Sequence, residues 1–155
     1  MRAKGLLLAG VALLIVGAGG LVLLGSGVPV QRAGTAPDRG AWIFRAGTDP
    51  DGRPIPYAGG MMMPMSCAGC HGVDGHGLQT PMFVSPNITR RNLTNPAGML
   101  EPDGTRGPRY TDALIQRAVT QGIDAEGKPL AWPMPRWQLT SREWGDLFAY
   151  LKTLP

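Results

Sequence analysis

Apolar residues recur at helical spacing in three parts of the chain, and each part has its own start and stop signals. The first predicted helix has Thr35 as its N-cap and ends just before Gly47. The second begins near Thr111 or Asp112 and ends at Gly122. Their predicted packing faces are Gly40, Ile43, Phe44 and Gly47 in the first helix, and Leu114, Ile115, Ala118 and Val119 in the second. The chain between them is rich in Gly and Pro, which predicts long irregular loops.

The last predicted helix has the clearest signals. The stretch Thr140-Ser141-Arg142-Glu143 matches a capping box, in which the first and fourth residues satisfy each other's backbone N–H groups. Apolar residues then recur at positions i, i+3, i+4 and i+7: Trp144, Leu147, Phe148 and Leu151. We expect this face to be part of the core, with no chemical role.

An uncharged apolar run extends from Gly5 to Leu24, behind Arg2 and Lys4. A helix of about twenty residues spans about 30 Å, the thickness of the hydrocarbon core of a bilayer. The positive pair in front predicts that the N-terminus stays inside and the chain emerges outside. The alternative is a cleaved secretory signal, whose apolar region is usually shorter, about 7–15 residues. We expect a retained anchor within residues 1–27, and either reading sends the rest of the chain across the membrane.

The remainder has the size of one domain, with a linker predicted over residues 28–37 and the domain over residues 38–155. The chain of 155 residues contains 23 Gly and 15 Pro, and only 6% of its residues are aromatic, which predicts a thin core. The sequence pI is near 9.5. However, the segment before the apolar run contributes two of the four net positive charges, and no stripe of Lys and Arg with aromatic residues remains. We therefore expect no nucleic-acid partner.

The stretch Cys67-Ala68-Gly69-Cys70-His71 carries the chemistry. Two cysteines one helical turn apart can each bond one vinyl group of a single haem, and the adjacent histidine can be an axial ligand of the iron. A C-x-x-C pair also occurs in redox disulfides and in zinc sites. A thioredoxin-type motif normally follows a strand within a βαβ pattern, which is not visible here, and a four-cysteine zinc site needs more than the two cysteines present. We therefore predict one haem c, bound covalently through Cys67 and Cys70, with His71 as an iron ligand.

The iron needs a second axial ligand or an open sixth position. His76, the only histidine besides His71, lies too close in sequence to reach the opposite face of the porphyrin easily. A thioether suits haem iron, and Met134 is the best candidate because flanking prolines stiffen its loop and the last helix begins directly behind it. The alternative makes Met134 an ordinary core residue. Met82 and Met99 lie nearer in sequence and lack this rigid setting.

Taken together, these features resemble the small single-haem class I cytochromes c over roughly residues 35–154. The resemblance rests on Cys67-Ala68-Gly69-Cys70-His71-Gly72, on Pro86-Asn87-Ile88, and on Met134-Pro135 followed by a helix ending Ala149-Tyr150-Leu151-Lys152. It implies an all-α fold, with three or four helices around one covalent haem, here preceded by the predicted transmembrane helix. It also implies iron ligation by a histidine and a methionine.

The resemblance implies further roles. The carbonyl of Pro86 would accept the second N–H group of His71, which fixes the orientation of the ring. Arg136 and Trp137 would lie near the haem propionates. The first and last helices would cross near the haem, with Gly40 meeting Phe148 or Tyr150.

The resemblance assigns no role to a methionine run that precedes the haem motif: Met61, Met62, Met63 and Met65. Clustered thioethers can bind Cu(I), and they are also flexible gap-fillers on apolar surfaces. Because the run lies just upstream of the haem motif and no histidine or spare cysteine accompanies it, we favour a role in covering the porphyrin or contacting a partner.

The sequence thus predicts a membrane-tethered electron carrier, not an enzyme, on the outer, periplasmic face of the cytoplasmic membrane. Its expected partners are redox proteins of respiratory or photosynthetic chains, namely a quinol-oxidising complex and a terminal oxidase or reductase. It could also be a permanent subunit of one such complex. The alternatives are a haem enzyme or gas sensor with an open sixth position, and a methionine-rich copper-binding module.

Overall fold

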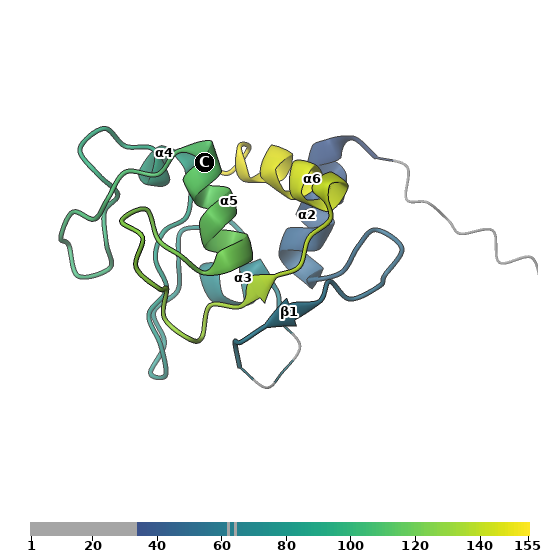
Figure 1. Cartoon of the computed structure of the whole chain (residues 1–155), viewed down its shortest axis with the longest axis horizontal. Coiled ribbons are helices and arrows are strands. Elements are labelled where there is room, and N and C mark those ends of the chain that lie inside the picture. Colours follow the sequence, from purple (N-terminus) through teal and green to yellow (C-terminus); the bar gives the residue numbers. More distant parts are fainter. Residues whose placement is uncertain (1–33, 62, 64) are drawn as a thin grey trace, which may run out of the picture. The chain divides into compact units, whose positions relative to one another are not determined.

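The computed structural model describes residues 34–61, 63 and 65–155 (Figure 1). The predicted anchor over residues 1–27 and residues 28–33 of the predicted linker lie outside this part of the chain. In the part that is described, no helix has the length and apolar character needed to cross a membrane. The first described helix begins at Ala36, directly after its predicted N-cap Thr35.

Five helices and one pair of short strands are present among the described residues. In chain order they are α2 (Ala36–Ala46), β1 (Tyr57–Ala58), α3 (Cys67–His71), α4 (Arg90–Leu93), α5 (Asp112–Gln121), β2 (Arg136–Trp137) and α6 (Ser141–Leu151). The three long helices α2, α5 and α6 begin and end where the sequence predicted. Their N-caps are Thr35, Thr111 and Thr140, and Gly47 and Gly122 end α2 and α5 in the left-handed conformation. These helix ends are local features, and local chemistry predicted them.

Helices α2 and α6, which lie side by side in Figure 1, form the most extensive contact between the described elements. Their crossing depends on Gly40. A Cβ atom placed at Gly40 would overlap the backbone carbonyl of Asp146 and lie 2.8 Å from the Cβ of Tyr150. The aromatic residue at the crossing is therefore Tyr150, whereas Phe148 stacks on Trp144 with ring centroids 5.1 Å apart.

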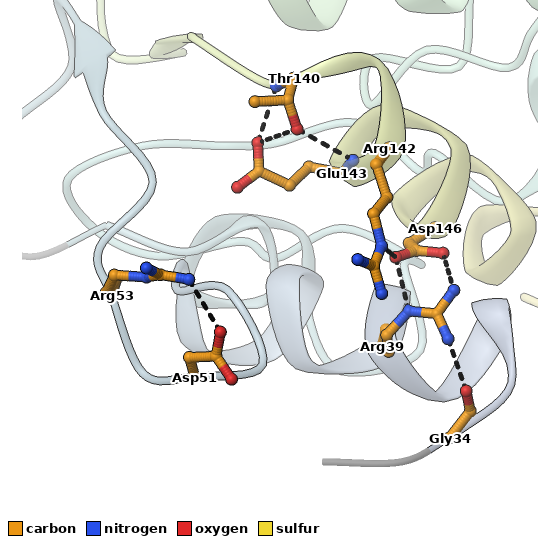
Figure 2. Close-up of polar contacts among 8 residues, drawn as sticks. All are labelled: Gly34, Arg39, Asp51, Arg53, Thr140, Arg142, Glu143 and Asp146. Carbon is orange, nitrogen blue, oxygen red and sulfur yellow. Dashed lines mark hydrogen bonds and ion pairs between the residues drawn. The ribbon is translucent and has the colours of Figure 1, made fainter. Parts of the chain in front are cut away.

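A bidentate ion pair fastens the same crossing (Figure 2). The Nε and Nη2 atoms of Arg39 donate to the two carboxylate oxygens of Asp146 at 2.7 and 2.6 Å, and Asp146 is buried. Such a fork is stronger and more directional than a single ionic hydrogen bond. Figure 2 also shows the predicted capping box of α6, in which the backbone N–H of Thr140 donates to Glu143 Oε2 at 2.7 Å.

The described residues form the predicted helical fold, to which the short strands β1 and β2 add one small pairing. They pair antiparallel, with Tyr57 opposite Trp137 and Ala58 opposite Arg136, and the two aromatic rings lie 5.1 Å apart between centroids. Two-residue strands carry almost no periodic signal, and the paired residues are about eighty positions apart in the sequence. The pairing joins the segment before the haem motif to the segment after Met134.

The buried apolar residues form two clusters rather than one continuous core. The first joins α2 and α6 with the segments beside them: Ile43, Phe44, Ile55, Met65, Trp137, Leu147, Tyr150 and Leu154. The second lies around α4 and α5: Leu93, Met99, Tyr110 and Ile115. The space between such clusters is where a large apolar group can be accommodated.

Candidate functional site

A cavity of about 250 Å³ lies between the two buried clusters. All four members of the second cluster line it, and so do Phe44, Met65, Trp137 and Leu147 of the first. Nearly every lining side chain is apolar. A flat apolar group in this space would extend the contact between the two clusters, which Ile88, Trp144 and Leu151 make only in part.

The predicted haem-attachment residues lie on one wall of this cavity. Helix α3 begins after Ser66, whose hydroxyl accepts a hydrogen bond from the backbone N–H of Gly69 at 3.1 Å. The helical turn brings Cys67, Cys70 and His71 together, and all three line the cavity. Removal from water raises the pKa of Cys67 to about 12 and also raises the pKa of Cys70. Reactive dithiol motifs lower the pKa of a cysteine, so this environment disfavours the redox-disulfide reading.

His71 is held by the loop that follows it. Its side chain is buried, and its Nδ1 lies 3.0 Å from the carbonyl oxygen of Pro86, the contact that the resemblance implied. The loop is closed by the N–H of Gly77, which donates to the carbonyl of His71 at 2.8 Å, and by the hydroxyl of Ser85, which donates to the carbonyl of Cys70. Burial lowers the pKa of His71, so the ring is neutral near pH 7. With Nδ1 donating to Pro86, Nε2 remains as the nitrogen that can bind a metal.

His76 is placed differently. It lies on the exposed loop after α3, where its Nδ1 is 3.2 Å from the carboxylate of Asp74. It does not line the cavity, in agreement with its predicted position as a solvated loop residue.

Among the described residues, four methionine side chains line the cavity: Met61, Met65, Met99 and Met134. Met82 does not, and its side chain is 84% exposed. Met134 lies on the segment Leu130–Pro135, all of which except Trp132 lines the cavity. Met99 is buried next to Leu93 in the second cluster, a position that its sequence neighbours did not indicate.

The segment before the haem motif supports the loop that carries Met134. The backbone N–H of Gly60 donates to the carbonyl of Trp132 at 3.1 Å, and a Cβ atom at Gly60 would lie 3.3 Å from the Cβ of Pro135. Gly60 has a positive φ of 78°, which lets the chain turn away after β1 and return toward α3. The segment that ends at Gly60 therefore packs against the loop of Met134.

Trp137 and Arg136 have separate environments. Trp137 is buried and lines the cavity. Arg136 does not line it, and its guanidinium donates to the backbone carbonyls of the neighbouring loop, at Leu130, Ala131 and Met134. The position near haem propionates that the resemblance implied for these two residues stays a prediction.

A family model described as Cytochrome c matches residues 57–155, which is more than half of the chain. The chain belongs to the cytochrome c family. Searches of curated proteins and of solved structures found no match. Cytochromes c bind haem c covalently, and the motif Cys67-Ala68-Gly69-Cys70-His71 lies within the matched region. The cofactor of this chain is therefore haem c. Its family indicates an electron-transfer haem protein.

The residues that line the cavity of this cytochrome c also fit haem c independently of the family match. It is apolar, it separates two buried clusters, and it brings two thiols and a neutral imidazole to one wall. Sequence reasoning did not identify Met99 and Tyr110 as lining residues. For Met61 and Met65, the position of the methionine run directly before the motif favoured covering of the porphyrin or contact with a partner.

Proposed function

We propose that this cytochrome c is an electron carrier whose iron is bound by His71 Nε2 and Met134 Sδ, with Cys67 and Cys70 forming the thioether bonds. The observation that carries the proposal is that one apolar cavity is lined by all four residues. Haem c, when bound, supplies the iron that changes between the ferrous and ferric states. A thioether ligand favours the ferrous state and raises the potential relative to a second histidine.

The protein contributes rigidity on both sides of the cavity. The carbonyl of Pro86 fixes the ring plane and tautomer of His71, and two prolines together with the segment ending at Gly60 hold the loop of Met134. Ligands that are held in place remain bound in both oxidation states. Little reorganisation then accompanies electron transfer, and the apolar lining keeps water away from the iron.

A spectroscopic experiment tests the proposal against an enzyme or sensor with an open sixth position. We expect the absorption spectrum of the dithionite-reduced protein to be low-spin and to stay unchanged for minutes after carbon monoxide is added. A high-spin ferrous spectrum, or rapid and complete carbon monoxide binding, would contradict the proposal and favour the open-site alternative.

The copper-binding alternative receives no support from the cavity. Met61 and Met65 line the same apolar space as the haem motif, as gap-filling side chains would. We propose that they cover the porphyrin.

We further propose that the partner is a redox protein with an uncharged, apolar docking face. Three segments that contribute lining residues contain no Asp, Glu, Lys or Arg: residues 54–73, 75–89 and 129–135. Exposed apolar side chains lie on each of them, at Met63, Met82 and Trp132. These three segments carry no formally charged side chain of their own, so they would contribute little electrostatic steering to association.

The salt dependence of electron transfer tests this docking face. Using native membranes supplied with a quinol, we expect the second-order reduction rate constant to change less than about twofold between about 0.01 and 1 M ionic strength, although the Debye length falls from about 30 to about 3 Å. Trp132→Glu should slow the reaction, whereas Leu100→Glu, which changes an exposed apolar residue outside these three segments, should not. A steep salt dependence, or equal effects of the two variants, would contradict the proposal.

The membrane tether and the periplasmic location remain proposals that rest on the run from Gly5 to Leu24 and on Arg2 and Lys4. A tether would keep the haem domain close to a quinol-oxidising complex and a terminal oxidase or reductase, either as a shuttle or as a fixed subunit. The intact mass of the protein extracted from membranes tests the tether, because a mature chain beginning near Val28 would show a cleaved signal.

A further inference from the structure

Arg136 lies two residues after Met134, and its guanidinium is bound by the loop that carries this methionine. Nη2 donates to the carbonyl of Leu130 at 2.8 Å, and Nη1 donates to the carbonyls of Met134 and Ala131, the latter at 3.4 Å. One side chain thus connects three carbonyl groups of one short loop. In the described part of the chain, no carboxylate forms an ion pair with Arg136, so these carbonyls are its hydrogen-bonding partners.

The backbone carbonyls of this loop need hydrogen-bond donors from outside it, because the loop itself provides few N–H groups. Pro133 and Pro135 have no N–H group, and the N–H of Met134 donates to the carbonyl of Ala131 at 3.1 Å. Arginine has five N–H donors in a rigid planar fork, so it can bind several carbonyl groups at fixed relative positions. Lysine carries the same charge on a flexible stem and lacks this geometry.

The guanidinium is itself fixed by the C-terminal end of α5. Gly122, which ends that helix with a φ of 68°, lies directly against it. A Cβ atom at Gly122 would overlap Nε and lie 2.8 Å from Nη2 of Arg136. The backbone of Arg136 is also paired with Ala58 in β1. Arg136 therefore links α5 and the strand pair to the loop of Met134, so the position of this loop depends on theirs.

We propose that Arg136 is the positioning residue of the sixth iron ligand: its fork fixes the loop so that Met134 Sδ stays on the iron. This inference rests on the proposed function, because it requires Met134 to be the ligand. Arg136 acts on the backbone of the loop that carries Met134. The arginine does not line the cavity, and it acts through three carbonyl groups.

Displacement of the methionine by added imidazole measures this role in the intact haem protein. Each molecule with an open loop can bind imidazole, so the apparent affinity of the ferric protein rises with the open fraction. We expect Arg136→Lys and Arg136→Gln to bind imidazole about tenfold more tightly or better than wild type, because charge-assisted hydrogen bonds to the loop are lost. The matched control is Arg142→Gln on α6, an exposed arginine that pairs with Asp146, which should bind imidazole like wild type.

A second pair of variants tests the contact between Gly122 and Arg136 without changing any charge. Gly122→Ala displaces the guanidinium, and Gly127→Ala imposes similar backbone strain at a φ of 88° in a place where a Cβ atom has no neighbour within 4 Å. We expect only Gly122→Ala to tighten imidazole binding and to weaken the red charge-transfer band of methionine-bound ferric haem.

The outcomes separate the two proposals. If wild type shows the band and Arg136→Lys binds imidazole as weakly as wild type does, the positioning role is wrong while the ligand assignment stands. If Arg142→Gln or Gly127→Ala tightens binding equally, the effect is general destabilisation and the inference is also wrong. If wild type lacks the band, the proposed function itself fails.

Discussion

Met134→Ala is expected to keep its covalent haem and to lose the red charge-transfer band that a methionine–iron(III) bond produces. Removing the thioether opens the sixth position to water, so the ferrous protein should bind carbon monoxide rapidly. The potential should fall, because a thioether stabilises ferrous iron more than water or a hydroxide does. Absorption spectra of both oxidation states and a potentiometric titration measure these changes.

The other methionines provide matched controls for this assignment. Met82→Ala alters an exposed side chain outside the cavity and should change neither the spectrum nor the stability. Met65→Ala and Met99→Ala remove buried side chains and should keep the band, at a cost of about 2–5 kcal/mol in the free energy of unfolding. If the band survives in Met134→Ala and disappears in Met61→Ala, Met65→Ala or Met99→Ala, the sixth ligand is one of those residues.

The Cys67→Ala/Cys70→Ala double variant is expected to lose its haem and its cooperative fold. Without a bound group, the protein would retain an apolar cavity of about 250 Å³ between its two clusters. At about 24 cal/mol per Å³, such a void costs about 6 kcal/mol. That is comparable with the whole stability of an ordinary domain, about 5–15 kcal/mol, and the Gly- and Pro-rich chain has little core to spare.

Two measurements check the role of the cysteines. Acid–organic extraction followed by mass spectrometry should show one haem retained on the wild-type chain and on each single variant, since one thioether bond is sufficient for retention. Circular dichroism during thermal unfolding should show a cooperative transition for these proteins and none for the double variant. Complete loss of haem from the wild-type protein during extraction would overturn the covalent assignment.

The sequence predicted the helix ends because their determinants are local. Thr35, Thr111 and Thr140 cap their helices, and Gly47 and Gly122 end two of them, as expected from neighbouring residues alone. The haem motif is equally local, since Cys67, Cys70 and His71 lie on one turn of α3. The rigid porphyrin fixes the distance between its vinyl groups, so the spacing of the cysteines was sufficient to predict the cofactor.

Contacts between distant segments could not be predicted in this way. The short strands β1 and β2 have no periodicity of their own, and their pairing depends on where the rest of the chain places them. The resemblance implied a position near the haem propionates for Arg136, which stays a prediction. The sequence did not indicate that the end of α5 and the carbonyls of the loop contact its guanidinium. The neighbours of a long flexible side chain are set by the tertiary structure.

By itself, then, the sequence determined three long helices, a covalent haem c and the family of the protein, because caps, helical faces and a fixed cofactor spacing act over a few residues. The tertiary structure alone decided which methionines line the cavity, that the segment ending at Gly60 supports the loop of Met134, and where Arg136 binds. Each of these depends on segments far apart in the chain packing around one large apolar space. Burial and hydrogen-bond geometry exist only once that packing has formed.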